Sequence, residues 1–134
     1  MNRGVVSNRT LPSIAVLAGD LACFFIFAVV GLRSHEDGIT ASGVLRAAIP
    51  FQVGWVLFGL AFGLLRPRRR LLASRPRPVL VAWLPAWLLG LSIRTFILGR
   101  AFAPTFAVVA LLFNGVLLLL WRSLLLARYE KSSD

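Results

Sequence analysis

Four of the polar residues inside long apolar stretches of the sequence are candidates for a functional role: Asp20, Arg94, Asn114 and Arg122. A carboxylate in such a stretch can hold a proton or a cation, or it can pair with an arginine. On helices, Asp20 and Asn114 would lie about 12 Å and about 15 Å from the starts of their segments. Because the hydrocarbon core of a bilayer is about 30 Å thick, helices entering from opposite faces would bring these depths close together. We therefore predict that Asp20 meets either Asn114 or an Arg122 side chain that reaches inward.

A second group of charged or titratable residues lies at the opposite side of the predicted bundle. Its members are Arg33, His35, Arg46, Arg94 and Arg100. Guanidinium groups recognise carboxylates and phosphates with paired hydrogen bonds, and histidine titrates near neutral pH. These residues could form an anion site, with Glu36 or Asp37 as internal counter-ions. In the alternative, Arg94 extends its charged end outward and the other side chains are solvated.

Four apolar segments must position these residues, and they cover about 12–32, 44–65, 79–99 and 104–127. Each is long enough to cross the hydrocarbon core as a helix, and none shows the alternation of a membrane β-barrel. The links between them are short, which makes consecutive helices antiparallel. The sequence therefore predicts an all-α membrane protein, a four-helix antiparallel bundle that forms a single domain over residues 1–134.

Composition supports the membrane assignment. The chain has 134 residues, of which 58% are hydrophobic and 15% are charged, with a net charge of +10. An ordinary soluble domain carries about 25% charged residues, and a small fold buries only about two-thirds of its surface. These values exclude a soluble enzyme and a disordered chain. A nucleic-acid module is also excluded, since the basic link lacks the interleaved aromatic residues of a single-strand platform.

The distribution of positive charge predicts the orientation, because cytoplasmic loops are enriched in Lys and Arg. Eleven of the fifteen basic residues fall on one side if the N-terminus is cytoplasmic, which predicts a multi-pass protein of the inner (plasma) membrane with both termini cytoplasmic. Six arginines within 66–77 would attract anionic lipids there, or they only set the topology. Trp83, Trp121 and Tyr129 would then anchor at the cytoplasmic interface.

Small residues, prolines and aromatic residues indicate close packing, either within the bundle or across an interface with a partner. Gly59 and Gly63 have small-xxx-small spacing, and Trp83, Trp87, Gly90 and Arg94 follow one helical stripe. The residues expected to pack in this way are Gly19, Pro50, Phe51, Trp55, Gly59, Gly63, Trp87 and Gly90.

Several short motifs, taken in order, resemble the DUF3054 family of small bacterial and archaeal four-helix membrane proteins of unassigned function. They are Gly19-Asp20, the stretch 31–35, Pro50-Phe51 with Trp55, Arg94, the stretch 104–106 and Trp121-Arg122. The resemblance implies four spans and singles out Asp20, His35, Pro50, Phe51, Trp55, Arg94 and Arg122. It implies no reaction, substrate or cofactor.

The sequence offers no recognisable catalytic or metal-binding motif, with one His and one Cys in the whole chain. We expect a non-catalytic protein without a cofactor or metal, acting as a structural or accessory subunit of a larger membrane assembly or as a homo-oligomer. One alternative is an oligomeric transporter of small solutes or protons that uses Asp20, by analogy with small multidrug exporters. Another is binding of anionic lipids or ligands through the outer arginines.

Overall fold

The computed structural model describes residues 13–33, 38–65 and 75–131, and all regular structure within these ranges is helical. The elements are α1 Ser13–Arg33, α2 Ala41–Ala61, α4 Pro76–Ser92, the π-helical segment η1 Ile93–Ile97 and α5 Pro104–Lys131. Four stretches are long and apolar enough to cross a membrane: Ala15–Arg33, Ala41–Ala61, Pro76–Ile97 and Pro104–Arg128. The predicted all-helical architecture with four such segments is confirmed.

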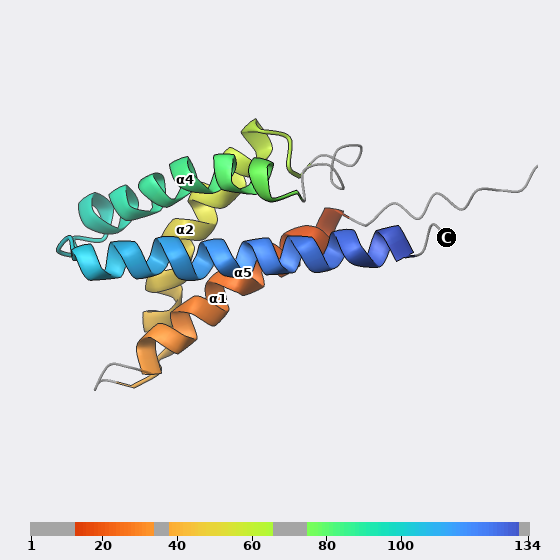
Figure 1. Ribbon diagram of the computed structural model, residues 1–134. Helices are drawn as coiled ribbons and strands as arrows, with labels where there is room; N and C mark the ends of the chain where they lie inside the picture. The colour runs from red at the N-terminus through yellow and green to blue at the C-terminus, as the bar shows by residue number, and fades with distance from the viewer. Residues whose placement is uncertain (1–12, 34–37, 66–74, 132–134) are drawn as a thin grey trace, which may run out of the picture.

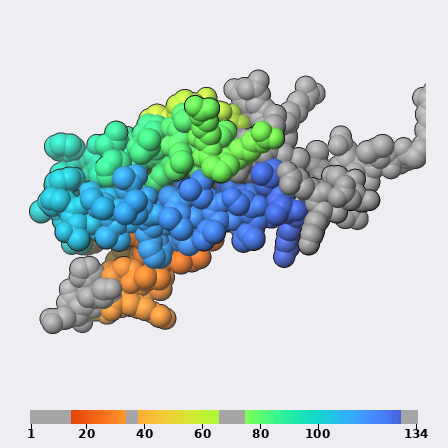
Figure 2. Space-filling view, viewed as in Figure 1, coloured from red at the N-terminus to blue at the C-terminus, as the bar shows by residue number. Residues whose placement is uncertain are grey.

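Consecutive helices run antiparallel and close into a ring of contacts (Figure 1). α1 packs on α2, α2 on α4, α4 on α5, and α5 returns to α1, so the first and last helices are neighbours as predicted. In Figure 2, α4 and α5 lie side by side over the visible face, and part of α1 shows beyond α5. We call the end that holds η1 and residues 98–103 the hairpin end, and the end where α5 finishes the terminal end.

Local sequence signals explain where α2 begins and ends. The Thr40 hydroxyl accepts a hydrogen bond from the Gly43 N–H at 3.1 Å, so the helix starts at Ala41, before the predicted residue 44. At the other end Gly63 has φ 77°, and the Leu64 N–H donates to the Gly59 carbonyl at 2.8 Å. This is a Schellman cap, which ends α2 at Ala61 and not at the predicted residue 65.

The remaining boundaries follow proline and the hairpin. α4 starts with Pro76, whose missing N–H costs nothing in the first turn of a helix. Both α2 and α4 continue through an internal proline, Pro50 and Pro85 respectively. Beyond η1, Gly99 adopts φ 64°, a conformation that glycine tolerates, and the chain turns into α5 at Pro104.

The core between the helices is aromatic. Phe27 of α1 lies 6.2 Å from Phe51 of α2 and 5.9 Å from Phe106 of α5, measured between ring centroids. Trp83 of α4 completes the cluster at 6.4 Å from Trp55. Aromatic pairs at such separations add to the stability gained by burying their surface. The cluster joins all four spanning helices near the middle of the bundle.

Candidate functional site

A fully buried ion pair joins α1 to α5. Arg122 Nε donates to Asp20 Oδ1 at 2.9 Å, and Arg122 Nη2 donates to Asp20 Oδ2 at 2.5 Å. Both side chains are fully buried. A planar guanidinium matches a carboxylate through two parallel hydrogen bonds, and this geometry makes a buried pair favourable. Of the two partners considered for Asp20, the structure selects Arg122.

Helix α2 supplies two further hydrogen bonds to this pair. The indole N–H of Trp55 donates to Asp20 Oδ2 at 3.1 Å, and Arg122 Nη1 donates to the Leu64 carbonyl at 3.4 Å. Leu64 directly follows Gly63, so the helix cap of α2 places this carbonyl at the ion pair. Three helices therefore meet at one polar centre, which we call the Asp20–Arg122 site and define as Asp20, Trp55, Leu64 and Arg122.

Close packing of α1 against α5 positions the pair. A side chain at Gly19 would overlap the ring of Trp121, so only glycine lets the indole lie against α1 here. The Trp121 N–H also points to the Val16 carbonyl at 3.4 Å. Trp121 directly precedes Arg122 and Gly19 directly precedes Asp20, so one contact fixes the approach of both charged residues. Gly19 is thus a packing residue within the bundle, in line with the prediction.

Asn114 does not reach Asp20. Its amide Nδ2 donates to the Ala110 carbonyl of its own helix at 3.1 Å, although the residue is fully buried. Its Oδ1 has no hydrogen-bond partner within the described part of the chain. Asp20 is contacted instead by Arg122, whose longer side chain reaches it from α5.

The contact between α2 and α4 depends on small residues. A Cβ at Gly90 would lie 2.5 Å from Phe51 Cδ1, so the ring of Phe51 occupies the space that glycine leaves. A Cβ at Gly54 would overlap the Ala86 carbonyl. Pro50 and Gly59 are buried in the same helix, whereas Gly63 lies beyond the helix as its cap. The predicted row from Gly59 to Gly63 therefore ends a helix and does not form a packing face.

Tryptophan N–H groups also link α4 to α5. Trp83 donates to the Leu111 carbonyl at 3.0 Å and Trp87 donates to the Ala107 carbonyl at 2.9 Å. Trp83 is 1% exposed, so the expectation that it anchors at the membrane surface is wrong. Its indole finds a hydrogen-bond partner inside the bundle, which removes the cost of burying the N–H. With Trp55 and Trp121, all four tryptophans of the chain use this N–H between helices.

Arg94 belongs to a different environment at the hairpin end. It is half-buried in η1, and its guanidinium carbon lies 3.9 Å from the centroid of the Phe106 ring. Short π-helical segments occur often at functional sites. Arg94 therefore contacts an aromatic face where the sequence suggested either an anion or solvent.

The other members of the predicted outer group are spread along the hairpin end. Arg33, Arg46 and Arg100 are exposed, and among the described residues none of them takes part in an ion pair. His35 lies outside the described residues, as do Glu36 and Asp37 and most of the basic stretch 66–77. The one member tied to Arg94 is Arg100, whose backbone N–H donates to the Arg94 carbonyl at 3.2 Å.

Two contributions to the Asp20–Arg122 site escaped sequence reasoning. Trp55 was expected only to pack, and the Leu64 carbonyl is a backbone group that carries no side-chain signal. A glycine just past an apolar helix is a usual sign of a C-cap, and Gly63 offered that signal. Gly54 was also missed, although the buried row Ala82, Ala86 and Gly90 on α4 has the four-residue spacing of a close contact.

Comparison with known proteins identifies the family. The family described as "Protein of unknown function (DUF3054)" matches residues 17–125, which is most of the chain. The chain belongs to the DUF3054 family. The match includes every residue of the Asp20–Arg122 site, together with Arg94 and Phe106, so this DUF3054 protein has both polar centres within the family region. No curated protein and no solved structure matches the chain.

The described side chains of this DUF3054 protein form a helix-joining ion pair. Within residues 13–33, 38–65 and 75–131, no three His, Cys, Asp or Glu side chains lie close enough to bind a metal ion. The buried carboxylate of Asp20 already accepts three hydrogen bonds from side chains. In this arrangement Asp20 acts as the acidic half of an ion pair, with both carboxylate oxygens hydrogen-bonded to other helices.

Proposed function

We propose that this DUF3054 protein is a non-catalytic, multi-pass protein of the plasma membrane that acts as a structural or accessory subunit of a larger membrane assembly. The observation that supports this proposal is the closure of the Asp20–Arg122 site. Oδ1 of Asp20 accepts from Arg122, and Oδ2 accepts from both Arg122 and Trp55. A carboxylate that binds a transported cation must offer free oxygen lone pairs, and here these lone pairs serve to join three helices.

The outward faces of the helices support the accessory role. The glycines at close helix contacts, such as Gly19, Gly54 and Gly90, face other helices of the same chain. Large apolar side chains are left on the outside, among them Leu57 at 53% and Leu112 at 61% exposed. Such faces suit acyl chains or the apolar helices of another membrane subunit.

Site-specific photo-crosslinking in native membranes tests the accessory role. A photoreactive residue at Leu112 of α5 and a matched one at Leu57 of α2 sample two outward faces. An accessory subunit gives one reproducible crosslinked membrane protein from one face, which co-purifies in fixed ratio in mild detergent. Recovery of a homogeneous monomer with no crosslink from either face would overturn the proposal.

The proposed orientation places both termini in the cytoplasm, supported by the excess of Lys and Arg on that side. The single native cysteine, Cys23, is buried and makes a suitable background for labelling. Ser132→Cys is expected to react with a membrane-impermeant maleimide only in inverted vesicles. Labelling in intact spheroplasts instead would reverse the orientation.

A second candidate function is proton-coupled transport by an oligomer that uses Asp20. It is favoured by one observation, namely that neutralising this carboxylate would release hydrogen bonds to α2 and α5 together. Flux through proteoliposomes that disappears in Asp20→Asn, while the variant remains folded, would favour transport over the accessory role. Flux that is unchanged in Asp20→Asn would exclude Asp20 as the coupling site.

A further inference from the structure

The hairpin end concentrates positive charge without a described counter-ion. Arg94 and Arg100 belong to one short segment, joined by the hydrogen bond from the Arg100 N–H to the Arg94 carbonyl, and their charges lie near enough to repel. The acidic residues of the described ranges are Asp20 and Glu130, which belong to the Asp20–Arg122 site and to the last turn of α5. The ends of η1 and α5 carry opposite partial charges, so they offset one another, and within the described ranges no carboxylate compensates the two guanidiniums.

The geometry of Arg94 suits a phosphate at the membrane surface. The helical stretch Pro76–Ile97 has 22 residues, which is about 33 Å of helix against about 30 Å of hydrocarbon. Arg94 lies less than one turn from the end of this stretch, close to the level of lipid headgroups. One face of its guanidinium lies on the Phe106 ring, which leaves its N–H edge available for paired hydrogen bonds to an anion.

Exposed apolar residues surround this position. Phe96 is 84% exposed, Ile97 is 75% exposed and Phe102 is 60% exposed. Side chains of this kind at a helix end favour insertion into the interfacial region of a bilayer. A phosphate that reaches Arg94 between them is therefore more readily part of a lipid than a soluble ion.

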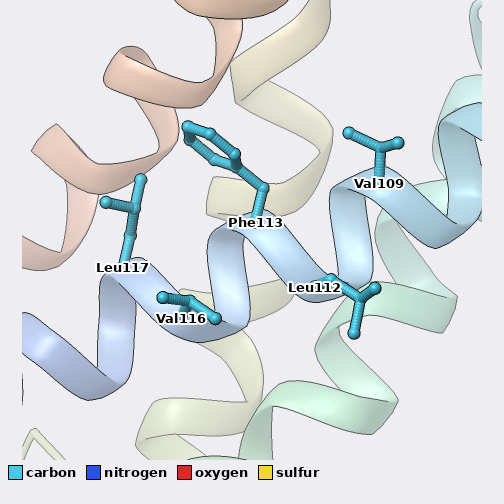
Figure 3. A pocket seen from close by; sticks show the side chains of 5 residues that line it. All are labelled: Val109, Leu112, Phe113, Val116 and Leu117. Atoms are coloured by element: carbon cyan, nitrogen blue, oxygen red, sulfur yellow. The ribbon is translucent and has the colours of Figure 1, made fainter.

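An apolar groove on α5 begins about one turn from Phe106. Figure 3 shows the side chains that line it: Val109, Leu112, Phe113, Val116 and Leu117. Phe106 and Phe113 both pack against Phe27, at 5.9 and 5.7 Å between ring centroids, so they lie on the same side of α5. The groove thus runs along α5 from about one turn beyond Phe106, the ring that Arg94 contacts, toward the middle of the bundle, in the direction an acyl chain takes from its headgroup.

From these observations we propose that Arg94 and Arg100 bind the phosphate of an anionic phospholipid in the leaflet at the hairpin end, with one acyl chain in the groove of α5. Arg94 supplies the planar contact and Arg100 supplies a second charge at the rim. The five side chains that line the groove contribute only apolar surface. This site is separate from the Asp20–Arg122 site, and it does not depend on the accessory role.

Lipid retention tests the proposal. The full chain is reconstituted in bilayers of phosphatidylglycerol and phosphatidylcholine, extracted in mild detergent, and weighed by native mass spectrometry to count retained phosphatidylglycerol. Arg94→Gln is expected to lower retention about fivefold, and Arg94→Gln with Arg100→Gln more strongly. Arg128→Gln, an exposed arginine near the end of α5, is the matched control and should change nothing. Equal retention in wild type and in the double variant would overturn the proposal.

Two further experiments identify the source of the phosphate and the role of the groove. Release of the retained lipid by millimolar inorganic phosphate would assign the arginines to a soluble anion and overturn the lipid assignment. Val116→Trp fills the groove, and it is expected to lower retention of phosphatidylglycerol while leaving thermal stability in detergent unchanged. Retention at the wild-type level in a folded Val116→Trp variant would remove the acyl chain from the proposal.

Discussion

Arg122 and Arg94 are both arginines of membrane-spanning segments, and they are held in opposite ways. Arg122 is fully buried, and its N–H groups donate to a carboxylate and to a backbone carbonyl. Arg94 is half-buried, and its contact is the face of an aromatic ring. Burial of a charge is favourable only when hydrogen bonds replace its hydration. Arg122 finds these hydrogen bonds inside the bundle, whereas Arg94 keeps N–H groups that can donate to another molecule. The guanidinium of Arg122 thus serves to join helices at the terminal end, and that of Arg94 is the one proposed to bind a ligand at the hairpin end.

The largest effect on stability is expected from a substitution of Arg122. Arg122→Met leaves Asp20 buried without its partner, and we expect a loss of about 3–5 kcal/mol in unfolding free energy. Unfolding in mixed micelles of rising denaturing-detergent content measures this loss. Arg128→Met, an exposed position on the same helix, is the control and should be neutral. If Asp20→Leu combined with Arg122→Met were as unstable as Arg122→Met alone, the loss would not come from an unpaired charge.

Trp55 offers a sharper test of the same site. Trp55→Phe keeps most of the ring and removes the N–H that donates to Asp20 Oδ2, so we expect a loss of about 1.5–3 kcal/mol, typical of a hydrogen bond to a charged group. Trp87→Phe removes a similar N–H from a neutral carbonyl and should cost about 0.5–1.5 kcal/mol. The same micelle titration compares them. Equal losses would mean that the charge of Asp20 adds nothing to the bond.

At the hairpin end the expected effect on stability is smaller. Arg94→Gln removes the contact with the Phe106 ring, and a partly exposed cation–π pair contributes about 0.5–1 kcal/mol. We therefore expect a small loss of unfolding free energy beside a large loss of retained lipid. A loss as large as that of Arg122→Met would place Arg94 among the residues that hold the bundle together, and the contrast between the two arginines would disappear.

The smallest effect is expected at Asn114, between the two ends. Its Oδ1 has no partner among the described residues, so Asn114→Leu removes a buried polar atom at no cost in contacts between helices. The unfolding free energy should stay the same or rise by about 1 kcal/mol. A clear loss of stability in detergent would show that the amide has a partner, such as a bound water, that stabilises the core.

Sequence reasoning reached the four-helix arrangement and the contact of Asp20 with α5, because both follow from one-dimensional quantities. Apolar length located the four helices, and depth along a helix brought Asp20 close to the residues of α5. It could not choose between Asn114 and Arg122, since the choice depends on side-chain reach and on the tilt between α1 and α5. The sequence could not predict the contact of the Leu64 carbonyl either. The direction of the backbone after Gly63 depends on the positive φ of that glycine, 77°.

The buried position of Trp83 shows a further limit. Tryptophan near a span end usually marks the interface, but here the ring packs at 5.6 Å from Phe24 and finds a carbonyl acceptor on α5. Only the partner helix makes that burial possible, and the partner lies 28 residues further along the chain.

The separation of Asp20 and Arg122 has a consequence for how the chain is made. The two residues lie 102 positions apart, one in the first helix and the other in the last. α1 therefore enters the membrane with a carboxylate that lacks its arginine until α5 follows it. The ion pair can close only after α5 has been synthesised and inserted. A chain that stops before Arg122 keeps a carboxylate without its arginine in α1, and an ionised group of this kind within a membrane helix is costly.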